Sequence, residues 1–110
     1  MIEERLFNVL GPLVGGSVYP QVIPLENKTW PAISFSTISV DSNNTVSGES
    51  DEDLRVQINI YSRKLVEVLA LRRLVFDAIR QEFEGSLRIT DFDVYEPETK
   101  MFGRVLEFYI

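Results

Sequence analysis

Paired carboxylates near the C-terminus are the residues whose types and spacing could do chemistry. Asp91 and Asp93 stand two positions apart, and so do Glu96 and Glu98. On a strand this spacing puts both members of a pair on one face. Two carboxylates so placed can divide acid–base roles or bind a divalent cation such as Mg²⁺.

The rest of the composition argues against catalysis. The chain has no His and no Cys, which excludes the commonest general base near neutral pH, thiolate chemistry and disulfides. No nucleophile motif or glycine-rich phosphate loop accompanies the carboxylate pairs, and a solvated strand edge is the simpler explanation of them. We therefore expect no catalytic residue, no metal site and no cofactor. An enzyme that uses Asp91, Asp93 or Glu98 with a divalent metal remains the minor alternative.

A second group of carboxylates lies in the segment DSNNTVSGESDED, residues 41–53. It contains five of the 17 acidic residues, no basic residue, and Val46 as its one sizeable apolar side chain. Ordering thirteen residues costs about 13–25 kcal/mol of backbone entropy, which this side chain cannot offset. We expect a loop that is mobile in the isolated chain and contacts a partner. The candidate contact residues are Asp41, Asn43, Asn44, Val46, Glu49, Asp51, Glu52 and Asp53.

The distribution of charge narrows the class of partner. The net charge is −6, from 17 acidic and 11 basic residues. Taking the five acids of residues 41–53 from the 17 leaves 12 against 11, so the remainder is almost neutral. Because nucleic-acid binding needs clustered Lys and Arg, we expect no sequence-specific nucleic-acid partner. No apolar run approaches the ~20 residues of a membrane span, and the N-terminus shows no signal peptide. We expect the cytoplasm, or a particle assembled there.

Two amphipathic helices are indicated by apolar residues at helical spacing. The first covers residues 2–10 and ends at Gly11-Pro12. The second runs to about Glu84, with Ser62 as its N-cap and Gly85 as a left-handed stop. Its expected apolar face consists of Leu65, Val68, Leu69, Val75, Phe76, Ile79 and Phe83.

Alternating apolar residues predict four strands, at residues 32–40, 54–61, 87–95 and 102–110. A change of phase near Ser36-Thr37, and another between Ile89 and Phe92, each predict a β-bulge. The proline-rich stretch between the first helix and the first of these strands is expected to be an irregular connection, with room for a short strand at Val18-Tyr19.

The order helix, two strands, helix, two strands predicts an α+β fold. We expect a two-layer sandwich in which two helices pack on a mainly antiparallel four-stranded sheet. The length of 110 residues favours a single domain over residues 1–110.

Arg72 is a cation within the apolar face of the second helix. A buried unpaired guanidinium costs several kcal/mol, so we expect an ion pair or a side chain that reaches solvent. Asp91 and Asp93 are plausible partners by their strand positions. The alternative is that these charges belong to a subunit interface.

Four segments, in their order and spacing, resemble the small tail-completion, or tail-terminator, proteins of long-tailed bacteriophages. The resemblance covers nearly the whole chain and is carried by GGSVYP (15–20), TWPAISF (29–35), RVQINIYS (55–62) and YEPETKMFGRVLEFYI (95–110).

The resemblance implies two helices on a sheet and a homohexameric ring at the head-proximal end of the tail tube. Such a ring stops tube polymerisation, meets the major tail tube protein and presents a surface to the head connector. It implies a virion protein, present in the host cytoplasm before assembly, with no catalytic residues. In related proteins the loop that matches residues 41–53 is mobile in the monomer and ordered in the ring. A different class remains open: a two-layer binding module that recognises a basic peptide through the acidic loop.

Overall fold

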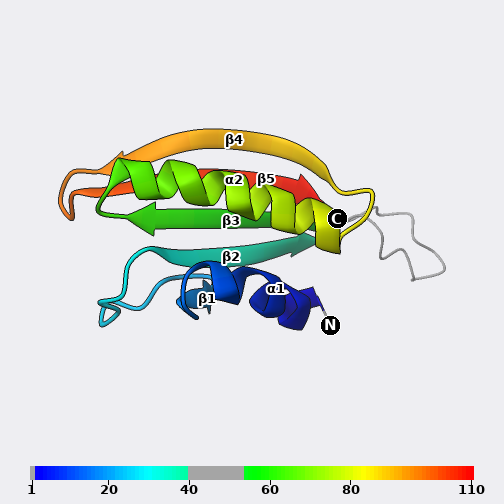
Figure 1. Ribbon diagram of the computed structural model, residues 1–110, viewed down its shortest axis with the longest axis horizontal. Helices are drawn as coiled ribbons and strands as arrows, with labels where there is room; N and C mark the ends of the chain where they lie inside the picture. Colours follow the sequence, from blue (N-terminus) through cyan, green and yellow to red (C-terminus); the bar gives the residue numbers. More distant parts are fainter. Residues whose placement is uncertain (1, 40–53) are drawn as a thin grey trace.

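The computed structural model describes residues 2–39 and 54–110, and it has the expected α+β architecture (Figure 1). Val40 and all of the acidic segment, residues 41–53, lie outside the described residues. In chain order the elements are α1 (Ile2–Leu10), the 3₁₀ turn η1 (Gly11–Leu13), β1 (Val18–Pro20), β2 (Ala32–Ser39), β3 (Leu54–Ser62), α2 (Leu65–Glu82), β4 (Leu87–Glu96) and β5 (Met101–Tyr109).

The described strands form one sheet in the order β1-β2-β3-β5-β4. β1 runs parallel to β2, and the other neighbours are antiparallel. The prediction of a four-stranded sheet was therefore wrong by one strand, although the short strand allowed for at Val18-Tyr19 is present as β1. β1 is only three residues long and ends at Pro20, so its local sequence resembles a connection. Its pairing with β2, Val18 opposite Ile33, joins residues far apart in the chain that no local pattern reveals.

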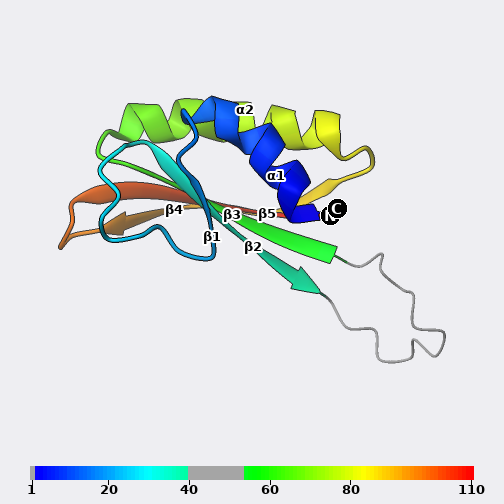
Figure 2. The same cartoon turned by 90° about the horizontal axis from the view of Figure 1, so that it is seen from below.

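Both helices lie on the same face of the sheet and form the second layer (Figure 2). α2 packs over β3 and β5. α1 lies beside β2, where Phe7 meets the edge of Phe35 at 5.2 Å between ring centroids. Arg5 joins the two helices, because its Nε donates to a carboxylate oxygen of Glu82 at 3.0 Å.

The core lies between the two layers. Along β3, Val56, Ile58 and Ile60 are fully buried beneath the helices, as their alternation with polar residues predicted. The other large, fully buried side chains come from both helices and from β2 and β5: Leu6, Leu10, Ile33, Phe35, Val68, Val75, Ile79, Leu106 and Phe108.

One predicted bulge is confirmed and the other is wrong. The pairing of β4 with β5 shifts between Arg88 and Thr90, at the start of the stretch from Ile89 to Phe92 where a bulge was expected. The β2–β3 register runs without a shift from Ala32 to Ser39. Thr37 takes a core-side position there, and its hydroxyl donates to Glu3 at 3.4 Å. A polar residue satisfied by α1 therefore produced the apparent change of phase.

The start of α2 also differs from the prediction. Ser62 belongs to β3 and pairs with Phe102, so it is not the N-cap, which is Lys64. The buried Ser62 hydroxyl still supports the first turn, because it donates to the carboxylate of Glu67. The predicted stop is confirmed: α2 ends at Glu82, and Gly85 has a left-handed φ of 85°.

Candidate functional site

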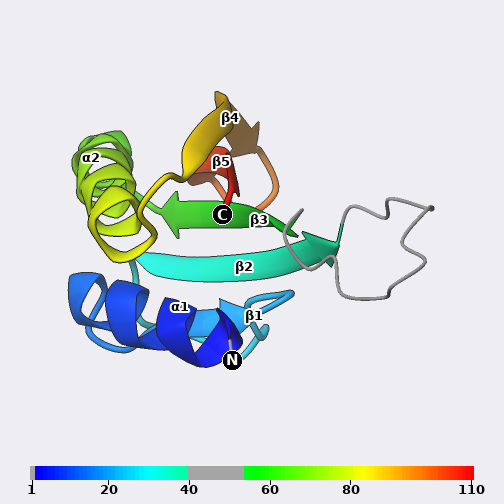
Figure 3. The same cartoon turned by 90° about the vertical axis from the view of Figure 1, so that its right-hand side faces the viewer.

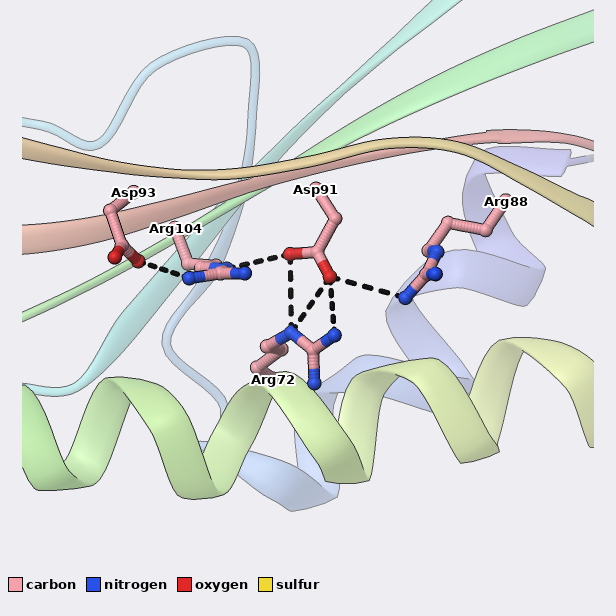
Figure 4. A network of polar contacts seen from close by, with 5 residues as sticks. All are labelled: Arg72, Arg88, Asp91, Asp93 and Arg104. Atoms are coloured by element: carbon pink, nitrogen blue, oxygen red, sulfur yellow. Dashed lines mark hydrogen bonds and ion pairs between the residues drawn. The ribbon is translucent and has the colours of Figure 1, made fainter.

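A network of five charged side chains connects α2 to the strand pair β4–β5 (Figure 4). Asp91 lies at its centre. Arg72 donates from Nε to the two Asp91 carboxylate oxygens at 3.1 and 2.8 Å, and from Nη2 to the second of them. Arg104 Nε donates to the first oxygen at 2.6 Å, and Arg88 Nη1 to the second at 3.1 Å. Arg104 also donates to Asp93.

The predicted pairing of Arg72 with a strand carboxylate is confirmed for Asp91 but not for Asp93. Asp93 pairs across the sheet with Arg104, and its side chain is 60% exposed. Sequence reasoning missed Arg104. The signal was present, since Arg104 alternates in phase with Leu106 and Phe108 and so points toward the helices.

The electrostatics of Asp91 follow from its burial and its three cations. Its side chain is 12% exposed. Burial alone would raise its pKa, but the hydrogen bonds from Arg72 and Arg104 outweigh burial and lower the pKa to about 2. The hydrogen bond to Asp91 in turn raises the pKa of the Arg104 guanidinium. Asp91 therefore stays ionised near neutral pH, with both oxygens engaged, and is poorly suited to proton transfer or metal binding.

The acidic pairs do not form a shared site. Glu96 ends β4 and accepts a hydrogen bond from the Thr99 hydroxyl at 3.0 Å. Glu98 lies in the following turn, so the two do not share a strand face as the spacing had suggested. Within residues 2–39 and 54–110, no three acidic side chains are grouped as a metal site would require.

Glu96 instead borders a cavity of about 510 Å³, which the connection between β1 and β2 closes on one side. Trp30, Tyr61 and Met101 also line this cavity. Burial, and secondarily the charge of Glu96, raise the pKa of the Tyr61 hydroxyl. Tyr61 alternates with the helix-facing residues of β3, so the cavity lies on the sheet face away from the helices.

Comparison with known families decides the class of protein. The family model described as "Tail completion protein gp17" matches residues 8–110. The chain belongs to this family. The resemblance drawn from the sequence is thereby confirmed, and the protein is a structural component of bacteriophage tails, found in the virion. A search of curated proteins found no match.

Membership of the tail completion family gives the protein a role in the phage tail, but it does not show which residues contact other proteins. The predicted contact residues between Asp41 and Asp53 lie outside the described part of the chain. The charges at Arg72, Asp91 and Asp93 are paired within the chain: Arg72 and Asp91 join α2 to β4, and Asp93 pairs with Arg104 of β5. Neither described helix has both the length and the hydropathy needed to cross a membrane.

Proposed function

We propose that this tail completion protein closes the head-proximal end of a phage tail tube as a homohexameric ring. The ring ends polymerisation of the major tail tube protein and offers a surface to the head connector. The observation that carries the proposal is the family match, which extends over residues 8–110 and so includes every described strand. The protein acts by geometry and needs no active site.

The two edges of the sheet support assembly through unlike surfaces. A ring brings one patch of each copy against a different patch of the next. At one edge, β1 is short, ends at a proline, and its Val18 N–H is already bonded to the Gly16 carbonyl at 2.8 Å. At the other edge, β4 has ten residues. Native proteins protect edges that must not pair. β1 is protected by its length and its proline, whereas β4 carries a bulge between Arg88 and Thr90 and the helix-facing Asp91 and Asp93, so the two edges present different surfaces.

The acidic segment, residues 41–53, is part of the proposal through its charge. Six copies would contribute thirty acidic side chains, five from each. Facing the channel, they would repel DNA phosphates and let the genome pass without sticking. Facing the tube, they would require Lys or Arg on the major tail tube protein.

Polymerisation of purified major tail tube protein tests the proposal. With this chain added in substoichiometric amounts, tubes should become shorter and carry one ring at one end in electron micrographs. Light scattering of the chain alone measures ring formation directly. A persistent monomer that leaves tube length unchanged would contradict the proposal and favour the peptide-binding module instead.

A further inference from the structure

The helix layer leaves one strand of the sheet uncovered. α2 packs mainly over β3 and β5. β4 is the edge strand next to β5 (Figure 3), and most of its residues are exposed. A groove of about 310 Å³ remains between the start of α2 and β4. Leu65 forms its helix side, Tyr95 and Phe102 form its strand side, and Asp93 contributes the charged side chain of its lining.

The flank of α2 beside this groove is apolar near the start of the helix and becomes basic toward its C-terminal end. Leu65 and Leu69 were expected in the core, yet each is 44% exposed. They share a helical stripe with Arg72, which reaches down to β4. Next along the same flank, Phe76 lies between Arg80 and Arg88, whose guanidinium carbons are 5.5 and 5.2 Å from its ring centroid.

Beyond the groove, toward the C-terminal end of α2, positive charge exceeds negative charge. Three guanidinium groups meet the two carboxylates of Asp91 and Asp93, and Arg80 adds a fourth cation nearby. A carboxylate brought beside Arg80 and Arg88 would therefore find a favourable potential.

The opposite side of the molecule has complementary properties. On α1, Arg5 faces α2, where it binds Glu82 and lies over the ring of Phe83. By helical spacing, Glu4 and Phe7 project from the other flank, away from α2. Glu3 lies on the same side but turns to β2, where it accepts a hydrogen bond from Thr37. Phe7 is a large apolar side chain that meets Phe35 with one edge and is still 39% exposed, one helical turn from the exposed Glu4.

We propose that α1 of a neighbouring copy occupies the groove beside α2, over β4. Phe7 of that copy packs against Leu65 and Leu69, and its Glu4 approaches the guanidinium of Arg80 or Arg88. The helix layer is then continuous from one subunit to the next. This interface rests on the proposed ring and specifies which surfaces form it.

The occupant is a second copy because the two flanks differ in charge and lie at opposite ends of one layer. Pairing the basic flank with itself would bring like charges together. A contact between the acidic flank of one copy and the basic flank of the next avoids this repulsion. The same contact can be repeated from copy to copy around an axis, as a closed ring requires.

Disulfide trapping tests the contact cleanly, because the chain has no cysteine. The double variant Phe7→Cys, Leu69→Cys should give a ladder of disulfide-linked oligomers under mild oxidation. Mixed single variants should give the mixed dimer in preference to either homodimer. Phe7→Cys with Val22→Cys is the matched control, because Val22 is exposed on the connection between β1 and β2. If Phe7→Cys unfolds the chain, Glu4→Cys replaces it.

Charge reversal gives an independent readout. Glu4→Arg and Arg80→Glu should each weaken self-association about tenfold, and combining them should restore it. Rings that form without the disulfide-linked ladder in the double variant, or homodimers that dominate the mixture of single variants, would overturn this interface while leaving the proposed function intact. A chain that neither associates nor cross-links would overturn both.

Discussion

Arg72 and Asp91 lie nineteen positions apart in the chain and join α2 to β4, with Arg72 Nε 2.8 Å from the nearer carboxylate oxygen. As a strand, β4 pairs only with β5 among the described elements. The ion pair therefore links this edge strand directly to the helix layer. It also sets how closely α2 approaches β4, and so the width of the groove between them.

Asp91→Asn should destabilise the fold by about 2 kcal/mol, because it leaves Arg72 and Arg104 crowded without their common counter-ion. Urea denaturation measures the change in the free energy of unfolding. Asp93→Asn is the matched control and should cost less than about 1 kcal/mol, because that carboxylate is largely solvated. Equal losses for the two variants would show that Asp91 has no central position.

The contribution of Asp91 to the free energy of unfolding should depend on pH in the acid range. The pKa of Asp91 falls from its ordinary value of 3.8 to about 2 in the folded protein. The folded state thus binds this proton less tightly than the unfolded chain does, and the stabilisation is complete above about pH 4. It should be lost as the pH falls toward 2. The stability difference between the native chain and Asp91→Asn, measured by urea denaturation at several pH values, should narrow over that interval. A constant difference would contradict the assignment.

Gly103 allows a close approach on the sheet face away from the helices. A Cβ at this position would stand 2.7 Å from Tyr61 Cε1 and 2.7 Å from Val94 Cγ2. Gly103→Ala should therefore cost about 1–2 kcal/mol by overpacking. Gly11→Ala is the control: its Cβ would meet no atom within 4 Å, so its thermal midpoint should stay within a few degrees of the native value. A neutral Gly103→Ala would show that the Tyr61 and Val94 side chains move aside easily.

Much of the fold was predictable because it rests on local periodicity. The alternation through Val56, Ile58 and Ile60 fixes which face of β3 is dry, and the structure buries all three. Arg72 in an apolar helix face required a carboxylate, and Asp91 supplies it. In both cases the need, for burial of an apolar face or for a counter-ion, can be inferred from the residue and its neighbours in the sequence.

The wrong predictions concern residues whose pairing partner or covering element lies far away in the sequence. Val18 pairs with Ile33 across a proline-rich connection, so the local sequence allowed a short strand at Val18-Tyr19 but could not show that it joins the sheet. Thr37 was taken as a break in phase because its partner, Glu3, lies on α1. Leu65 and Leu69 were assigned to the core, although periodicity cannot tell whether a residue's own chain covers it. Their exposure is the basis of the proposed contact with a second copy.

Tail length in particles made without this protein tests the central claim most directly. Electron micrographs of a phage whose copy of this gene is deleted should show tails of variable and excessive length, unattached to capsids, because nothing caps the tube. Supplying the protein from a plasmid should restore one length and joined particles. Tails of normal, uniform length that still join capsids in its absence would contradict the account.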